Sequence, residues 1–207
     1  MTLTLFESIQ RIVHDELARV RSAEIGTVDK QHPHAGESDD DNYECTVVLR
    51  NSGIVLPRVP VATQRIGSAS IPGVGELVLV QFVNGDLNAP VIVGRLYNEE
   101  DRPPPNSNGQ SVLHVPLGGS DDESVHVEIV SGDERAIVVR LGAAMTVELR
   151  DDDPVVQVDV GGKASVAIAR DGGLEVESAS SLKLKGSEVS IEAQGQLTLK
   201  GATVNIN

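Results

Sequence analysis

The 207-residue sequence has almost no aromatic side chains: it contains two phenylalanines, two tyrosines and no tryptophan. A hydrophobic core must therefore be built from valine, isoleucine and leucine. The sole cysteine, Cys45, excludes a disulfide within the chain and a zinc site made of cysteines. Because Cys45 lies inside an apolar run, we expect a small buried side chain there rather than a nucleophile.

Long apolar runs and an excess of positive charge are also missing. No run approaches the roughly 20 apolar residues of a membrane-spanning helix. Residues 1–22 interleave charged and apolar side chains, so we expect no signal peptide. The chain carries 17 lysines and arginines against 31 aspartates and glutamates, a net charge of −14. Phosphate backbones repel such a chain, and we expect no binding to nucleic acid.

Residues 1–22 are predicted to contain an amphipathic helix that begins near residue 4. Thr4 is a suitable N-cap, and Glu7, three residues later, completes the capping-box pattern. Apolar side chains recur at helical spacing, mostly along one stripe: Leu5, Ile9, Ile12, Leu17 and Val20. Two interpretations stay open, because the stripe can pack on the chain's own domain or serve docking and oligomerisation.

From residue 23 to residue 98 the apolar period changes to two, the period of β-strands. Five short strands separated by turn residues are predicted: Ile25–Val28, Tyr43–Leu49, Ile54–Val61, Glu76–Val83 and Pro90–Leu96. Asn84 and Gly85 favour a hairpin between the last two strands, because both residues tolerate positive φ. Both alternating sets of the fourth strand are mostly apolar, which predicts that this strand is covered on both faces. Five strands suit a small closed barrel of the OB type.

Residues 99–110 form a predicted linker, in which three consecutive prolines favour an extended spacer. Residues 111–207 contain no aromatic residue and show an internal repeat of apolar pairs at positions i and i+2. Two such pairs are Val139/Leu141 and Val147/Leu149. Seven further pairs follow at steps of seven or eight residues: Val158/Val160, Val166/Ile168, Leu174/Val176, Leu182/Leu184, Val189/Ile191, Leu197/Leu199 and Val204/Ile206.

A single ribbon of these short strands buries too little apolar surface to offset the entropy of ordering it. Two architectures would solve the problem. One chain can coil into a solenoid with three short strands per turn. Alternatively, three chains can intertwine, each supplying one face of a triangular prism. The spacing of the pairs does not choose between the two.

The stretch from Ile71 to Asn98 contains an ordered pattern: Pro-x-x-Gly-Glu-x-Val-x-Val-x-Phe, then Asn-Gly-Asp, then Pro-x-x-x-Gly-x-Leu-Tyr-Asn. This pattern resembles the OB domain of baseplate assembly protein V, the central spike of contractile phage tails, and of the valine–glycine repeat spike of type VI secretion. The repeat that ends in Gly201–Asn207 is similar to that family's spike β-helix. The resemblance covers about residues 24–207.

The resemblance implies a mainly β fold: an N-terminal helix, an OB barrel over residues 23–98, and an intertwined triple-stranded β-helix over residues 111–207. It implies a homotrimeric needle whose axis is filled by the seven apolar pairs from Val158 to Ile206. It also implies a structural, non-enzymatic spike that caps the tail tube at the baseplate and pierces a target envelope. The machine would be a phage tail, a tailocin or an extracellular injection system.

The implied partners are two further copies, baseplate hub and tail-tube proteins, and, transiently, the target membrane. Assembly is expected in the cytoplasm, and the mature location in a virion or an extracellular particle.

The gap between barrel and repeat is too short for the lysozyme domain of some relatives. No histidine follows His126, so the His-x-His iron site of some phage spikes is not expected. We predict instead that a tip protein with proline–alanine–alanine–arginine repeats docks on Val204, Asn205, Ile206 and Asn207.

Other polar motifs favour structural roles over chemistry, and we expect no catalytic, cofactor or metal site. His32 and His34 flank a proline in a polar loop, where a solvated loop is favoured over a metal site. His114 and His126 lie in alternating strands and are expected to face outward. Acidic runs at 39–41, 121–123 and 151–153 lack the spacing of a calcium loop and suit turns.

Two alternative functions are a monomeric β-solenoid enzyme acting on polysaccharide, which would need aromatic sugar platforms, and an OB-fold nucleic-acid binder, which would need a basic groove.

Overall fold

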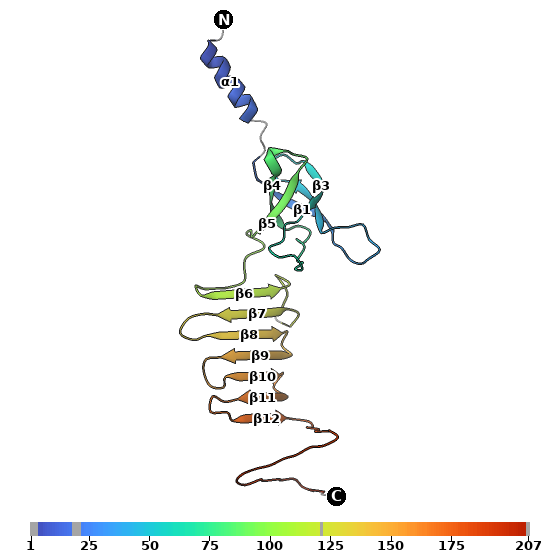
Figure 1. Ribbon diagram of the computed structural model, residues 1–207, viewed down its shortest axis with the longest axis vertical. Helices are drawn as coiled ribbons and strands as arrows, with labels where there is room; N and C mark the ends of the chain where they lie inside the picture. Colours follow the sequence, from blue (N-terminus) through green and yellow to red (C-terminus); the bar gives the residue numbers. More distant parts are fainter. Residues whose placement is uncertain (1–3, 18–21, 121, 206–207) are drawn as a thin grey trace. The chain divides into compact units, whose positions relative to one another are not determined.

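The computed structural model describes residues 4–17, 22–120 and 122–205. The chain divides into two compact units, residues 1–103 and residues 104–207. The first unit contains a helix and a five-stranded sheet, and the second contains a seven-stranded sheet (Figure 1). Among the helices of the described residues, none is long and apolar enough to cross a membrane.

The N-terminal helix α1 (Leu5–Leu17) begins where the sequence predicts. Thr4 N and Thr4 Oγ1 donate to Glu7 Oε2 at 2.8 and 2.9 Å, and Glu7 N donates back to Thr4 Oγ1 at 3.4 Å. The capping box is thereby confirmed, and the backbone and side-chain hydrogen bonds from Thr4 lower the pKa of Glu7. Residues 18–21, with Val20 of the predicted stripe, lie outside the described residues. Apolar side chains of α1 are exposed in the single chain: Leu5, Phe6, Ile9, Ile12 and Val13.

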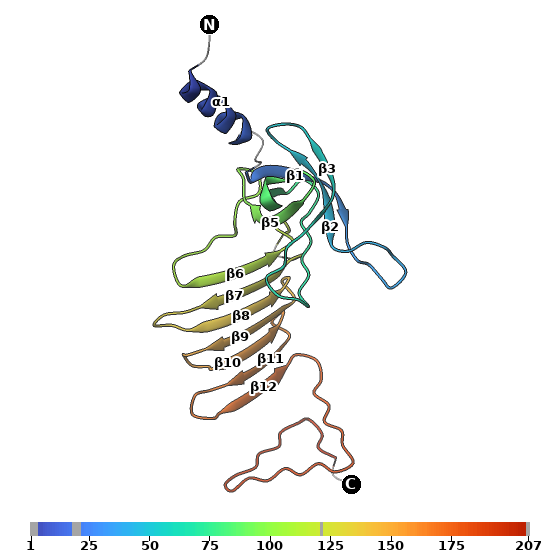
Figure 2. The same cartoon turned by 45° about the horizontal axis from the view of Figure 1, so that its top comes forward.

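Five antiparallel strands of the first unit form a barrel in the order β3-β2-β1-β4-β5. They are β1 (Glu24–His32), β2 (Glu44–Leu49), β3 (Val55–Pro60), β4 (Leu77–Phe82) and β5 (Pro90–Leu96). The two edge strands meet where Val61 bridges Ile92 in parallel, and Ala62 N donates to Ile92 O at 2.8 Å. This closure gives the strand order of an OB barrel, and Figure 2 shows its curvature. The five predicted strands are confirmed.

The barrel interior is filled almost entirely by aliphatic side chains. Its fully buried members include Val28, Val47, Leu49, Val80 and Ile92, and Phe82 is the one aromatic ring among its buried residues. Cys45 is fully buried, as predicted, and burial raises the pKa of its thiol. The expected double coverage of β4 is wrong, because its outward residues Leu77 and Leu79 are only half-buried and Gln81 is exposed.

Two local features explain why the barrel strands can approach and turn as they do. Gly26 lies in β1 against β2, where a Cβ atom would stand 2.3 Å from Val47 Cγ1, so only glycine fits there without a shift. Between β4 and β5 the chain turns through a short 3₁₀ segment, Val83–Gly85. Asn84 and Gly85 both have positive φ there, 54° and 75°, as the predicted hairpin requires.

The second unit is an antiparallel meander in which each strand pairs with its neighbours in sequence. Its strands are β6 (Gln110–Val115), β7 (Val125–Val130), β8 (Ala136–Leu141), β9 (Met145–Arg150), β10 (Val156–Val160), β11 (Ala164–Ile168) and β12 (Leu174–Ser178). The solenoid alternative does not describe this segment, because the chain folds back at each turn instead of coiling.

The expected intertwining from residue 111 needs a correction for the same segment. The strands from Gln110 to Ser178 hydrogen-bond within the chain rather than to sister copies. A hairpin with a three-residue turn, such as the one between β8 and β9, brings two strands together at little entropic cost. A strand from another molecule has no such advantage. Residues 179–205 form no strand in the single chain and are exposed throughout.

Candidate functional site

One face of the second sheet carries unbroken rows of apolar side chains. The strand register aligns a central row from β6 to β12: Leu113, Val127, Val139, Val147, Val158, Val166 and Val176. A flanking row on the same face runs through Ile129, Ile137, Leu149, Val156, Ile168 and Leu174. On the other flank lie Val115, Val125, Leu141, Met145 and Val160. We call this surface the open face.

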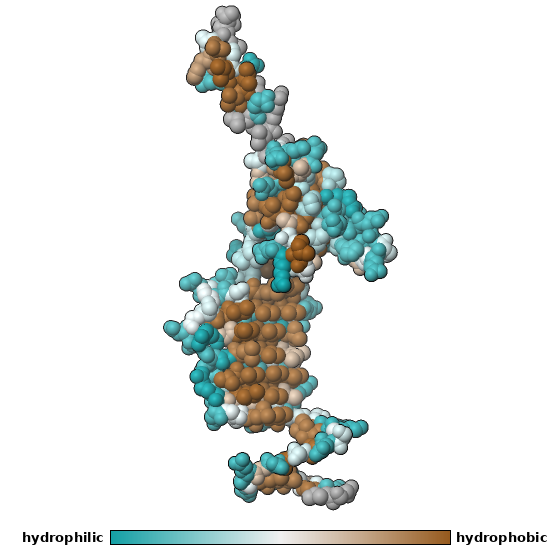
Figure 3. Space-filling view, viewed as in Figure 1, coloured by the Kyte–Doolittle hydropathy of each residue, from teal (hydrophilic) through white to brown (hydrophobic). Residues whose placement is uncertain are grey.

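In the single chain the open face is uncovered. Figure 3 shows it as a continuous apolar column over β6–β12. Ten of its large side chains are between 42% and 66% exposed: Leu113, Val115, Val125, Ile129, Ile137, Leu141, Leu149, Val160, Leu174 and Val176. Monomeric soluble proteins rarely expose apolar patches this continuous, and such patches mark interaction surfaces.

The opposite face of the same sheet is mostly polar, with Val112 and the buried Val138 as apolar exceptions. Residues at the alternate positions of the strands include Glu128, Glu148, Gln157, Asp159 and Glu175. Several of these groups have partners along the sheet: Glu148 pairs with Arg150, and Gln110 Nε2 donates to Glu128 Oε1 at 3.0 Å. A sheet that is apolar on one face and solvated on the other is the pattern of a half-buried antiparallel sheet.

The gain from covering the open face is large relative to the stability of a domain. Fully burying a valine, leucine or isoleucine side chain contributes about 1.5–3 kcal/mol, and about half of that remains to be gained at each of the ten exposed positions. The sum is on the order of 10 kcal/mol per chain, comparable with the whole stability of a small domain. The open face is therefore the strongest candidate for a functional surface in the second unit.

The structure brings together six of the predicted axis residues on the open face. Val158, Val160, Val166, Ile168, Leu174 and Val176 lie on β10–β12 and point to the same side of the sheet. Seven more lie beyond β12 in the extended segment and are exposed: Leu182, Leu184, Val189, Ile191, Leu197, Leu199 and Val204. Asn205 is exposed as well, whereas Ile206 and Asn207 lie outside the described residues.

The sequence indicated the apolar pairs of β8 and β9, Val139/Leu141 and Val147/Leu149, but the part of the open face that β6 and β7 supply was missed. The same two-residue alternation is present there, at Leu113/Val115 and at Val125/Val127/Ile129. The loop between β6 and β7 interrupts the step of seven or eight residues, so a search for regular spacing does not find these strands. Alternation without regular spacing was the signal that could have found them.

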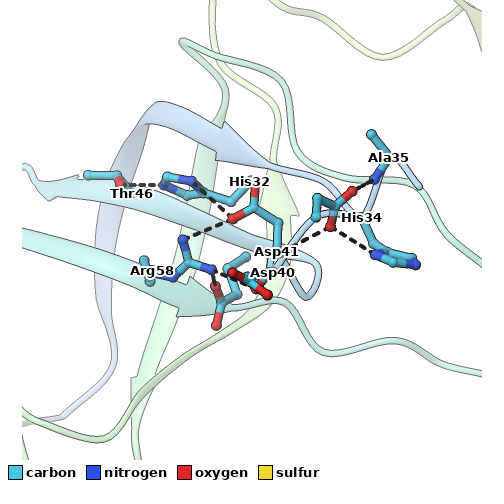
Figure 4. Close-up of polar contacts among 9 residues, drawn as sticks. His32, His34, Ala35, Asp40, Asp41, Thr46 and Arg58 are labelled. Carbon is cyan, nitrogen blue, oxygen red and sulfur yellow. Dashed lines mark hydrogen bonds and ion pairs between the residues drawn. The ribbon is translucent and has the colours of Figure 1, made fainter. Parts of the chain in front are cut away.

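His32, the last residue of β1, and His34, in the polar loop that follows, lie beside acids of that loop (Figure 4). His34 Nδ1 lies 2.9 Å from Asp39 Oδ1, and Asp39 Oδ2 also accepts from the backbone of Ala35 and Gly36 at 2.6 and 2.8 Å. The hydrogen bond from His34, followed by those from the backbone, lowers the pKa of Asp39 to about 2. The Asp39 carboxylate therefore orders this loop.

His32 has a separate set of neighbours. Its Nε2 lies 3.0 Å from Thr46 Oγ1, and its Nδ1 lies 3.9 Å from Asp41, which itself pairs with Arg58 at 2.9 Å (Figure 4). Arg58 also pairs with Glu44 at 2.8 Å. The two histidines thus serve different carboxylates. No group of three or more metal-ligating side chains occurs in the part of the chain that the structure describes.

The other acidic runs act as turn residues where the structure describes them. Asp153 Oδ1 accepts from Arg170 N at 2.9 Å, and Asp151 pairs with Arg135. Ser120 Oγ donates to Glu123 Oε2 at 3.3 Å within the loop that joins β6 to β7. Asp121 lies outside the described residues. The contacts of Asp151 and Asp153 connect neighbouring turns along one edge of the sheet, and that of Glu123 lies within one loop, which is the turn role that the sequence favours for these acids.

Barrel and sheet together define a mainly β protein that contains an OB domain. Residues 46–97, from β2 to the end of β5, match the family described as the type VI secretion system/phage-baseplate injector OB domain. Residues 46–97 are thus similar to the injector OB domain, and the resemblance of the chain to the central spikes of contractile machines is confirmed.

Curated relatives come from the same family. The chain is 35% identical over 106 residues to the type VI secretion system spike protein VgrG5 of Pseudomonas aeruginosa, a match that covers 48% of this chain and 12% of that protein. It is 35% identical over 75 residues to the spike protein VgrG1a of the same organism, covering 36% of this chain and 11% of that protein. The match spans about an eighth or less of the length of these relatives.

Proposed function

We propose that this protein is the structural central spike of a contractile injection machine and that it works as a homotrimer without catalytic activity. The observation that carries the proposal is the open face: a continuous apolar surface on a sheet whose other face is mostly polar. The similarity of residues 46–97 to the injector OB domain supports the choice of machine. Three open faces turned inward would form a triangular prism with a dry aliphatic interior.

The scarcity of aromatic residues supports a narrow shared interior. The central row of the open face consists of six valines and one leucine, all small aliphatic side chains that three faces can interdigitate. Bulky rings would overfill such a space. The polar faces would then lie outside, where their carboxylates keep the assembled needle soluble.

The segment after β12 would continue the needle in a different way. Residues 179–205 have no strand partner in their own chain, yet they keep apolar pairs at the spacing of the repeat. We infer that three copies of this segment wind around one another, so that backbone groups unpaired in one chain find partners in its sisters. The intertwined part of the spike would thus begin after Ser178 instead of at residue 111.

The two ends of the spike would meet different partners. The OB barrels would form a collar on the baseplate hub and tail tube. The apolar strand end at Val204–Asn207 would bind a tip protein with proline–alanine–alanine–arginine repeats. During contraction the needle would lead the tube through the target envelope. Winding three chains together suits this task, because no chain can leave the needle without breaking pairs with both sisters.

The native mass of the purified protein tests the assembly. A mass of three times 21.9 kDa is expected. A mass of two times that value would replace the prism by two sheets packed face to face, and a monomer would remove the spike assignment. Binding of the tip is a separate test: a chain lacking residues 197–207 should fail to retain the tip protein in a pull-down. Undiminished retention would show that the tip binds elsewhere.

A further inference from the structure

The polar face of the second sheet carries a pair of histidines that its structural role does not use. His114 on β6 and His126 on β7 stand directly opposite each other in the strand register. Their Nδ1 atoms are 3.4 Å apart, where one imidazole donates a hydrogen bond to the other, and their ring centroids are 5.6 Å apart with the planes at 67°. Both side chains are half-buried, so their rotamers are restricted by the sheet while the ring nitrogens remain reachable from solvent.

We propose that His114 and His126 form a bidentate site for a divalent transition-metal ion, with Zn²⁺ as the representative ion. A tetrahedral ion bound at a Zn–N distance of about 2.0–2.1 Å holds two imidazole nitrogens about 3.3–3.4 Å apart. The Nδ1 atoms already have this separation. Water would fill the remaining coordination positions.

The carboxylate of Glu128 supports the role of His126 as a ligand. Glu128 Oε2 lies 3.7 Å from His126 Nε2, the ring nitrogen that does not face His114. Gln110 Nε2 donates to the other oxygen of Glu128 at 3.0 Å. The separation between Glu128 and His126 is that of an ion pair and exceeds a hydrogen bond, so Glu128 would have to approach Nε2 on metal binding to accept its proton and leave the other nitrogen as the ligand, the usual arrangement around protein-bound zinc.

The charges around the pair are mixed but permit a cation. Arg140 on β8 is the register neighbour of His126 on its other side, and its side chain is exposed, so its guanidinium can remain in solvent. Glu148 on β9 pairs with Arg150 rather than with Arg140. On the side of His114, β6 is the edge strand of the described sheet. The bound ion would clip β6 to β7, the first hairpin of the second unit.

Calorimetric titration of the full chain with ZnCl₂ at pH 7.5 tests the site. We expect one ion per chain. His114→Gln and His126→Gln should each weaken binding at least tenfold, and Glu128→Gln should weaken it by about tenfold, because it removes only the orienting carboxylate. The double variant His32→Gln/His34→Gln keeps the pair and should bind like the native chain. Equal affinity in the His114→Gln protein, or loss of binding in the double variant, would overturn the proposal.

Hydrogen exchange supplies a readout that folding defects cannot imitate. Zn²⁺ should slow exchange in the β6–β7 hairpin, residues 110–130, at least threefold in the native chain, and should leave the barrel strands unchanged. In the His126→Gln protein the same addition should have no effect on the hairpin. Slowing that is spread over the whole chain, or that persists in the variant, would show adventitious binding and refute the site.

Discussion

The OB barrel and the second sheet use the same aliphatic residues but complete their cores differently. In the barrel, Val28, Val47 and Leu49 are no more than 1% exposed, because the strands curve until β3 meets β5. In the second sheet the corresponding valines and leucines stay half-exposed, because seven strands lie in one layer that does not close. The barrel therefore completes its hydrophobic core within one chain, whereas the apolar side chains of the open face remain uncovered in the single chain.

The difference shows that strand alternation alone does not tell whether a chain covers its own apolar face. Closure depends on how far a sheet curves and on what the turns allow. The barrel has five strands with register shifts between β1 and β2, β2 and β3, and β4 and β5, which bend and coil the sheet. The meander of β6–β12 has continuous registers and remains one layer.

The largest expected effect comes from a charge at the centre of the open face. Val158→Asp would place one carboxylate per chain in the proposed dry interior, and burying unpaired charges there should abolish assembly. The native mass should fall to that of one chain. The matched control is Gln157→Asp, one residue away on the polar face, which should assemble normally. A Val158→Asp protein that keeps the native mass would show that the open face is not the assembly surface.

Truncating a side chain in the barrel core should lower the stability of the first unit only. Leu49→Ala leaves a cavity among fully buried neighbours and should destabilise the barrel by about 2–5 kcal/mol at any protein concentration. Tyr43 and Tyr97 both lie in the first unit, so tyrosine fluorescence in urea follows the barrel alone. The comparison variant, Leu174→Ala on the open face, should leave this transition unchanged and weaken assembly. If Leu49→Ala became harmless at high concentration, the barrel would not be a self-sufficient core.

Adding a methyl group inside the barrel should destabilise it less than removing the Leu49 side chain. Gly26→Ala sets a methyl group 2.3 Å from Val47 Cγ1, so β1 and β2 must separate, and we expect a loss of about 1–3 kcal/mol. Gly36→Ala is the matched control, because no atom lies within 4 Å of its added methyl group and its φ is not positive. Its urea midpoint should change little. Equal midpoints for both variants would contradict the close packing at Gly26.

The sequence predicted the barrel better than the second sheet, for a physical reason. Turn residues such as Asn84 and Gly85 mark the strand ends of the barrel, and these ends can be read from the sequence even though β1 pairs with the distant strand β4. In the second half, the same i, i+2 pairs fit strands that pair within a chain and strands that pair between chains. The boundary at Ser178 therefore could not be predicted, because it depends on competition between local hairpins and other copies.

The histidines show the same limit at the level of side chains. Alternation predicts correctly that His114 and His126 share the polar face, since both occupy the positions opposite to the valine rows. Their direct pairing depends on the register of β6 with β7, which the loop between the two strands sets. Neither the 3.4 Å approach of the two rings nor the nearby Glu128 carboxylate can be read from the sequence without that register.

The smallest expected effect concerns the loop between β1 and β2, which is held by the Asp39 carboxylate and not by buried apolar side chains. The hydrogen bond from His34 and those from the backbone lower the pKa of Asp39 from its ordinary 3.8 to about 2. A lowered carboxyl pKa stabilises the loop above about pH 4, and this contribution is lost as the pH falls towards 2. Carboxyl-carbon NMR of Asp39 should follow that titration.

Replacing the principal donor should move the titration upward. In a His34→Gln protein the pKa of Asp39 should rise towards 3.8, because the largest cause of its lowering is removed, while the backbone donors at Ala35 and Gly36 remain. His14→Gln, on α1, is the control and should leave Asp39 unchanged. The barrel transition followed by tyrosine fluorescence should be the same in all three proteins, since the loop side chains lie outside the core. If Asp39 titrated near 3.8 in the native chain, the loop would be ordered by its strands alone, and this edge of the barrel would need no carboxylate.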